Sequence, residues 1–138
     1  MKVLTLPFTK RNGIKRTDKE NYILQLDYNK NVINHLNIAH ASASYALAET
    51  TSGYFLQTNF SDIADQTIPI LRASNVKYRR GGHGTIYSSA KLIGTNTKEL
   101  LSLLELKRKA LFFIQVKLYN EENEVLLIGD FEWFVTLK

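Results

Sequence analysis

Alternation of apolar and polar positions predicts most of the strands in this chain. Period-two patterns run from Tyr22 to Tyr28 and from Thr85 to Ile93, and each is typical of a strand with one buried face. Two longer alternating stretches flank the polar turn Asn120-Glu121-Glu122-Asn123 near the C-terminus and predict a hairpin. Another extended segment is predicted from Thr67 to Arg79, with a bulge where the alternation changes phase near Arg72 to Asn75.

Two further stretches have helical character. From about Ala41 to about Thr58, small and apolar residues occur without a charged face, which predicts a long helix enclosed by the rest of the protein. Asn96 to Lys109 is an amphipathic pattern that begins with a capping residue and carries five leucines. Val3 to Phe8 is predicted to form an edge strand, because Pro7 lacks the backbone donor that a central strand needs.

The predicted order is strand, long helix, strand, strand, short helix, strand, strand. Runs of antiparallel strands with one dominant helix favour an α+β fold over an alternating parallel fold. We therefore expect an antiparallel sheet of five to six strands folded around the helix at residues 41–58.

Glu49 is the only charged residue between Ala41 and Ser61. A carboxylate kept inside an enclosed helix needs a hydrogen-bonding partner or a chemical task. One interpretation is a buried carboxylate satisfied by neighbouring tyrosines or serines. The other is that Glu49, together with His40 before the helix, marks the reactive or binding centre.

Composition restricts the chemistry further. The chain has 138 residues and no cysteine, so we expect one domain, 1–138, with 1–19 as an N-terminal extension, and thiolate chemistry is excluded. The three histidines show no metal-ligand spacing, and neither a metal nor a cofactor is expected. The net charge of +5 is compatible with phosphates, CoA or nucleic acid, but nucleic-acid binding has only this charge behind it. Neither a signal peptide nor a membrane-spanning stretch is evident, so a cytoplasmic location is expected.

Two segments carry a resemblance to a known family. The segments NHLNIAHASASYALAE (34–49) and YRRGGHG (78–84) are the two. Together with the predicted order of elements, they resemble the hotdog-fold proteins of the acyl-CoA thioesterase superfamily. The similarity spans roughly Asn21 to Leu137 and looks closest to the phenylacetyl-CoA-thioesterase-like branch. It implies a five-stranded antiparallel sheet curled round one long helix, and a homodimer.

The branch has a loop of the form Asn-x-x-Gly-x-x-His-Gly-Gly, followed along the helix by an Asp or Glu. Asn34, His40 and Glu49 match its Asn, His and carboxylate, and the last two are nine positions apart, as the pattern requires. This chain departs from the pattern at three positions that the family fills with glycine, and it lacks the proline usual in the second loop. The three substituted positions are Asn37, Ala41 and Ser42.

The resemblance implies a thioesterase site without metal. Glu49 would act as general base on a water, or as nucleophile on the thioester carbonyl. The backbone N–H of Ala41 or Ser42 would face the developing oxyanion, since both begin the helix. His40 and Asn34 would orient the carbonyl or the water, although a capping histidine and a turn asparagine are ordinary alternatives.

Helix geometry adds a constraint. Nine residues of α-helix rise ~13.5 Å, so His40 and Glu49 of one chain cannot meet. They could meet if two copies packed antiparallel about a two-fold axis. The spacing thus predicts a dimer, or a dimer of dimers, with composite sites.

The loop Arg79-Arg80-Gly81-Gly82-His83 could hold CoA phosphates through backbone N–H groups and arginine side chains, or be a plain solvated turn. Hydrolysis of an acyl-CoA or related acyl thioester is the leading hypothesis. A non-catalytic module that binds acyl-CoA or lipid is the second, and the replaced glycines favour it. A hotdog dehydratase would need a longer His-to-carboxylate spacing and a Pro-Gly element.

Overall fold

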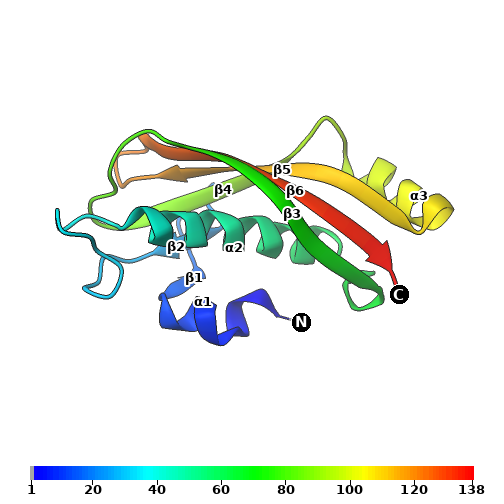
Figure 1. The fold of residues 1–138 in the computed structure, drawn as a ribbon, viewed down its shortest axis with the longest axis horizontal. Helices are drawn as coiled ribbons and strands as arrows, with labels where there is room; N and C mark the ends of the chain where they lie inside the picture. Colours follow the sequence, from blue (N-terminus) through cyan, green and yellow to red (C-terminus); the bar gives the residue numbers. More distant parts are fainter. Residues whose placement is uncertain (1) are drawn as a thin grey trace.

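One curled antiparallel sheet of six strands wraps a long helix (Figure 1), as the α+β prediction required. The computed structural model describes residues 2–138. The strand order across the sheet is β1-β2-β4-β5-β6-β3. The strands are β1 (Ile14–Arg16), β2 (Leu24–Leu26), β3 (Thr67–Tyr78), β4 (Ile86–Ile93), β5 (Lys109–Tyr119) and β6 (Val125–Leu137).

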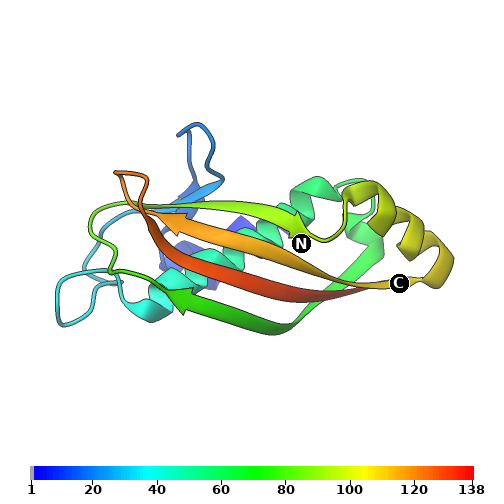
Figure 2. The same ribbon diagram turned by 90° about the horizontal axis from the view of Figure 1, so that it is seen from above.

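The long helix is α2 (Ala41–Asn59), which is within one residue of the predicted range. Its buried positions lie all round the helix, and Leu47 and Ala48 have no exposed surface. Burying a leucine side chain contributes about 1.5–3 kcal/mol, so the core depends on this enclosure. Seen from above, β4, β5, β6 and β3 run side by side across α2 (Figure 2).

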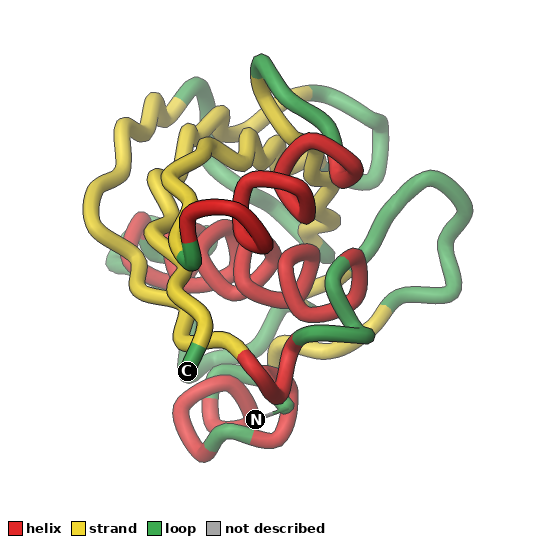
Figure 3. Tube along the Cα trace, turned by 90° about the vertical axis from the view of Figure 1, so that its right-hand side faces the viewer, coloured by secondary structure: helices red, strands yellow, loops and turns green. Residues whose placement is uncertain are grey.

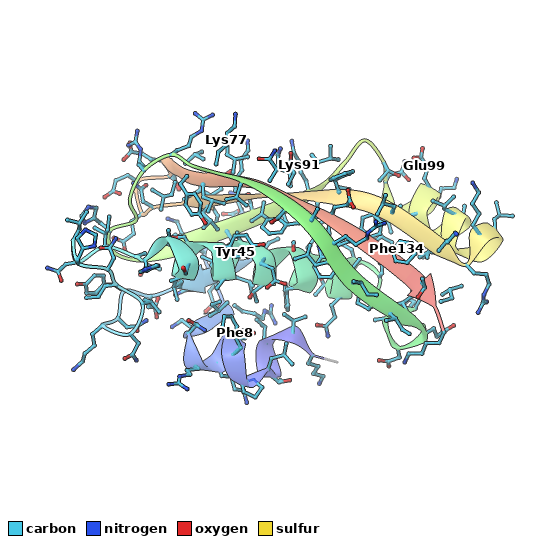
Figure 4. All side chains as sticks on the ribbon, viewed as in Figure 1. Phe8, Tyr45, Lys77, Lys91, Glu99 and Phe134 are labelled. Atoms are coloured by element: carbon cyan, nitrogen blue, oxygen red, sulfur yellow. The ribbon has the colours of Figure 1, made fainter. Side chains whose placement is uncertain are left out.

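The sheet follows the predicted alternation. Along β5 the residues Phe112, Ile114, Val116 and Leu118 are all buried on the concave face. Lys77 and Lys91 project from the opposite face, away from α2 (Figure 4). The predicted bulge is also present, as a register shift between Leu71 and Ala73 where β3 pairs with β6.

The predicted edge strand at Val3 to Phe8 is wrong. These residues form a single turn, η1 (Val3–Thr5), and a short helix, α1 (Pro7–Arg11). Pro7 stands at the start of α1, where its fixed φ suits a first helical turn and its missing N–H costs nothing. The two elements lie on the far side of α2 from the sheet, and Figure 3 shows them at the bottom of the molecule.

Three smaller differences have local causes. The strand predicted from Tyr22 to Tyr28 is paired only at Leu24–Leu26, and the polar approach before it contains the unpredicted strand β1. The helix predicted to reach Lys109 is α3 (Thr97–Lys107), because Arg108 takes a left-handed φ of 61° that ends it. Leu106, one of the five leucines of the amphipathic pattern, is 82% exposed, because it lies on the side of α3 opposite the buried Leu100 and Leu104.

A buried hydroxyl pair joins α2 to the sheet. Thr51 Oγ1 donates to Ser88 Oγ on β4 at 2.7 Å, and neither residue has exposed surface. Ser88 Oγ also accepts from the Leu24 N–H of β2 at 3.2 Å. Ser88 Oγ therefore links α2 to both β4 and β2, at a position without exposed surface where solvent water cannot replace it.

We expect Ser88→Ala to lower the free energy of unfolding by roughly 1–3 kcal/mol, because the buried Leu24 N–H on β2 loses the Ser88 oxygen as acceptor. The Thr51 hydroxyl loses its link to β4 and keeps only the Leu47 carbonyl of its own helix, 2.7 Å away. Ser89→Ala on the same strand, where the serine is half-buried, should change it by less than about 0.5 kcal/mol. Urea unfolding of both variants measures the difference. Equal effects of the two substitutions would contradict the anchoring role of Ser88.

Candidate functional site

Glu49 lies in the middle of α2 and lines a cavity of about 690 Å³. The cavity lies between the C-terminal half of α2, the first residues of β3 and the concave face of β5 and β6. Most of its wall is apolar, with Leu56, Phe60, Ile63, Leu71, Leu104 and Phe112 among the contributors. A carboxylate is therefore presented to a largely apolar space, in the size range of small-molecule sites.

Within residues 2–138, no side chain donates a hydrogen bond to the Glu49 carboxylate and no cation pairs with it. The interpretation of Glu49 as a carboxylate satisfied by tyrosine or serine neighbours is therefore wrong. The only serine contact is Ser52 Oγ, which donates to the Glu49 backbone carbonyl at 2.7 Å. Burial raises the pKa of the Glu49 side chain above its usual value, because desolvation disfavours the charged form.

His40 is the N-cap of α2. Its Nδ1 accepts from the Ser42 backbone N–H at 2.9 Å, and its ring is exposed. This contact assigns the tautomer, because an accepting Nδ1 leaves the proton on Nε2 in the neutral ring. The Ser42 N–H, predicted as an oxyanion donor, is thus already engaged, whereas the Ala41 N–H has no acceptor among residues 2–138.

Asn34 shapes the loop before α2. Its Oδ1 accepts from the backbone N–H of Leu36 at 2.9 Å and, more weakly, from that of Ile38 at 3.4 Å. The Asn34 N–H in turn donates to the Ile38 carbonyl at 2.8 Å, which closes a tight loop. These contacts are those of a turn asparagine, and its part in orienting a substrate stays a prediction.

The glycine-rich loop packs directly on this first loop. Ala39 N–H donates to the Gly82 carbonyl at 3.0 Å, and a Cβ on Gly81 would stand 2.4 Å from Ile38 Cδ1. A side chain at 81 would therefore require the end of the Ile38 side chain to move. Both loops lie at the end of the molecule where α2 begins (Figure 1).

The cations of this loop differ in their partners. Arg80 pairs with Glu124 on the β5–β6 turn, and the pKa of Glu124 is lowered first by the Asn120 hydrogen bond and then by Arg80. Arg79 and His83 are exposed, and their side chains have no partner among residues 2–138. Of the predicted CoA ligands, these two side chains are the ones available to an anion.

The structure therefore brings together all predicted site residues except one. Asn34, His40, the α2 N-terminus and the glycine-rich loop share one end, whereas Glu49 lies nine residues along α2, a rise of ~13.5 Å from His40. Within one chain they form two separate half-sites. Whether Glu49 and His40 act together stays a prediction.

Sequence reasoning missed other parts of the cavity. Gly53 and Gln57 line it at one and two turns beyond Glu49, and their spacing of four could have identified them. Trp133 lines it from β6, and its Nε1 donates to Ser52 Oγ at 3.1 Å. Val3 closes it from η1, with its N–H bonded to Gln57 Oε1 at 3.0 Å. No sequence signal connects Val3 to this helix.

Two possible features were searched for among residues 2–138. No group of three or more histidine, aspartate or glutamate side chains there could hold a metal ion. None of the described helices has the length and apolar character needed to span a membrane.

The comparisons with known proteins agree with this fold. The family model described as a domain of unknown function, DUF4442, matches residues 7–135. No curated protein matches the chain. Solved structures with a similar fold provide the remaining comparison, and three of them follow.

A Pseudomonas aeruginosa protein of unknown function, described as a probable thioesterase, superposes with a TM-score of 0.81 at 22% identity, covering 99% of this chain and 91% of its own. A Haemophilus influenzae thioesterase gives 0.73 at 15%, covering 98% and 86%. A Bacillus halodurans protein solved with CoA gives 0.64 at 18%, covering 81% and 69%. These likenesses establish the hotdog fold that the sequence resembles.

The raised pKa of Glu49 predicts a pH-dependent stability. Because the folded protein holds the Glu49 proton more tightly than the unfolded chain, this contribution is present below the ordinary glutamate value of 4.5 and is lost as pH rises through the folded-state pKa. Glu49→Gln should therefore raise the melting temperature at about pH 8 and lose that advantage at about pH 4. Thermal melts at both values test this, with the exposed Glu105→Gln as control. A constant difference at the two pH values would contradict the assignment.

Proposed function

The chain belongs to the family of the domain of unknown function DUF4442, and we propose that it is a thioester hydrolase acting on an acyl-CoA or a related acyl thioester. The observation that carries this proposal is the unpaired Glu49 carboxylate facing an apolar cavity. The hotdog fold shared with a thioesterase, and with a protein solved with CoA, supports it by analogy.

Glu49 suits the role of general base. Its raised pKa moves it toward the working pH, where a base is most effective, and no neighbouring cation holds its charge. Glu49 takes a proton from water as the water oxygen bonds to the thioester carbonyl carbon. The tetrahedral intermediate then breaks its C–S bond, the thiolate receives the proton from Glu49, and the acid is released.

The oxyanion of that intermediate would be stabilised at the start of α2. The Ala41 N–H is free there and benefits from the positive end of the helix dipole. The His40 Nε2–H, left free by the Nδ1 cap, would donate to the carbonyl or to the water. Asn34 would contribute by holding the loop that precedes both groups.

This site requires two chains. Strand β3 forms one edge of the sheet over twelve residues, and among residues 2–138 only one of its sides has a strand partner. A long unprotected edge invites pairing with another strand. A two-fold axis at this edge would set two copies of α2 antiparallel, so that His40 of one chain approaches Glu49 of the other.

A second interface would make a dimer of dimers. Ile70, Phe134 and Leu111 stand in one row across β3, β6 and β5, and the two aliphatic side chains are about half exposed at 50% and 48%. Such a row on the convex face is an apolar surface of the kind that assembly covers.

The CoA phosphates would lie at the glycine-rich loop. Arg79 and His83 are exposed and unpaired there, and Arg80 would have to share its charge with Glu124. This arrangement places the nucleotide near the loop of Asn34 and His40.

A non-catalytic module that binds acyl-CoA is the second candidate. The observation that favours it is the bond from the Ser42 N–H to His40, which leaves one backbone donor rather than two for an oxyanion. Such a protein would keep the cavity and the phosphate loop while lacking turnover.

Hydrolysis of acetyl-, hexanoyl-, decanoyl- and phenylacetyl-CoA, followed by release of free thiol, tests the proposed reaction. Wild type should hydrolyse at least one of them, and Glu49→Gln should lower kcat by about 10²–10⁴-fold, because the base is lost. Glu105→Gln is the matched control and should leave the rate unchanged. Equal rates for wild type and Glu49→Gln would remove Glu49 from the mechanism, and binding without turnover would favour the module.

Mixing two inactive variants tests the composite site. His40→Ala and Glu49→Gln chains should each be poorly active, and unfolding and refolding them together should restore about one quarter of wild-type activity. Half of the dimers formed are then mixed, and each mixed dimer carries one intact site of two. Light scattering should report a dimer or a tetramer. A monomer, or no recovery on mixing, would contradict a site shared between chains.

A further inference from the structure

Gly53 is an unexplained residue in the interior of α2. Glycine is less suited to a helix interior than any residue except proline, since it orders the most backbone freedom. The backbone conformation does not require a glycine here, because Gly53 is not among the glycines with positive φ. A nineteen-residue helix at the centre of the fold thus contains a residue that weakens it.

Packing within the chain does not require this glycine either. A Cβ at position 53 would lie 3.6 Å and 3.7 Å from two ring carbons of Trp133 and 3.9 Å from Val3 Cγ2, which are ordinary contact distances. Gly81 and Gly82 differ, because a Cβ there would come within 2.4 Å and 2.5 Å of Ile38 and Ile86. Alanine would therefore fit at 53 as the structure stands, whereas at 81 the Ile38 side chain would have to move and at 82 the buried Ile86 leaves no room.

The cavity runs alongside Gly53, one turn beyond Glu49 on the same face of α2, and the Trp133 ring lies within contact distance of the position that a Cβ would take. Trp133 forms the wall opposite, and Val3, held by its bond to Gln57, forms the wall from the N-terminal segment. The space of about 690 Å³ is larger than an acetyl group needs, and its apolar lining suits a hydrocarbon.

We infer that the acyl group of the substrate lies in this cavity past Gly53, beside the ring of Trp133, and that the site selects aliphatic acyl groups of medium length over acetyl. This inference rests on the proposed function for the position of the thioester beside Glu49. Each buried methylene should tighten binding about fourfold, so the preference should rise steeply along an acyl series until the cavity is filled. Residue 53 and the N-terminal segment determine where that limit falls.

Trp133 provides a readout that does not depend on hydrolysis. It is the only tryptophan in the sequence, and it lines the cavity next to Gly53. The Glu49→Gln protein, which should not hydrolyse the substrate, can be titrated with acetyl-, hexanoyl- and decanoyl-CoA. Binding is then followed by Trp133 fluorescence. Decanoyl-CoA should change the emission and bind at least tenfold more tightly than acetyl-CoA.

Substitution at position 53 separates a ligand role from a packing role. In the same background, Gly53→Leu should weaken decanoyl-CoA binding at least tenfold and leave acetyl-CoA binding unchanged. Gly53→Ala should raise the melting temperature by roughly 3–5 °C through helix propensity while weakening decanoyl-CoA binding less. The control is Thr58→Ala, which improves propensity on the exposed face of α2 outside the cavity and should leave binding unchanged.

The inference fails if decanoyl-CoA does not alter Trp133 emission, if both substitutions at 53 leave its affinity unchanged, or if Gly53→Ala lowers the melting temperature. The last result would mean that packing requires the glycine. Failure of the thioesterase proposal looks different, because the fluorescence changes would persist in a wild-type protein that hydrolyses nothing.

Discussion

Enclosure of a polar helix is the constraint on which this structure depends. Because the sheet and the N-terminal segment surround α2, its hydroxyl groups must find partners inside the protein. Thr51 finds Ser88, and Ser52 receives the Trp133 indole N–H. These two contacts fix the helix against β4 on one side and β6 on the other, so its position and rotation inside the sheet are determined by polar contacts as well as by packing.

The Glu49 carboxylate has no such partner within residues 2–138. Its backbone carbonyl is satisfied by Ser52, yet its carboxylate is left facing an apolar cavity with a raised pKa. Desolvation without compensation costs stability, and groups with pKa values perturbed in this way cluster at functional sites. Gly53, one turn from Glu49, also lowers the stability of the helix, although an alanine would fit at this position.

The rest of the candidate site is built by close contact between two loops at the other end of α2. Gly81 allows Ile38 to approach, and the bond from Ala39 to Gly82 joins the loops. His40 then caps the helix and orients its own ring. A rigid helix separates this end from Glu49 by ~13.5 Å, so the site that we propose needs a second copy of the chain to bring the two ends together.

The sequence by itself determined the enclosed helix, the bulged strand and the C-terminal hairpin, and it singled out Glu49 as a candidate, because each produces a periodic pattern or a single departure from one. It could not determine the N-terminal fold, where Val3 docks on Gln57 and two turns of helix replace the predicted strand. It also left open whether Glu49 has partners and whether His40 is a cap. Tertiary structure decided these points, because a hydrogen bond or a cavity wall formed by residues such as Val3, Gly53 and Trp133 depends on distances in space that local periodicity does not encode.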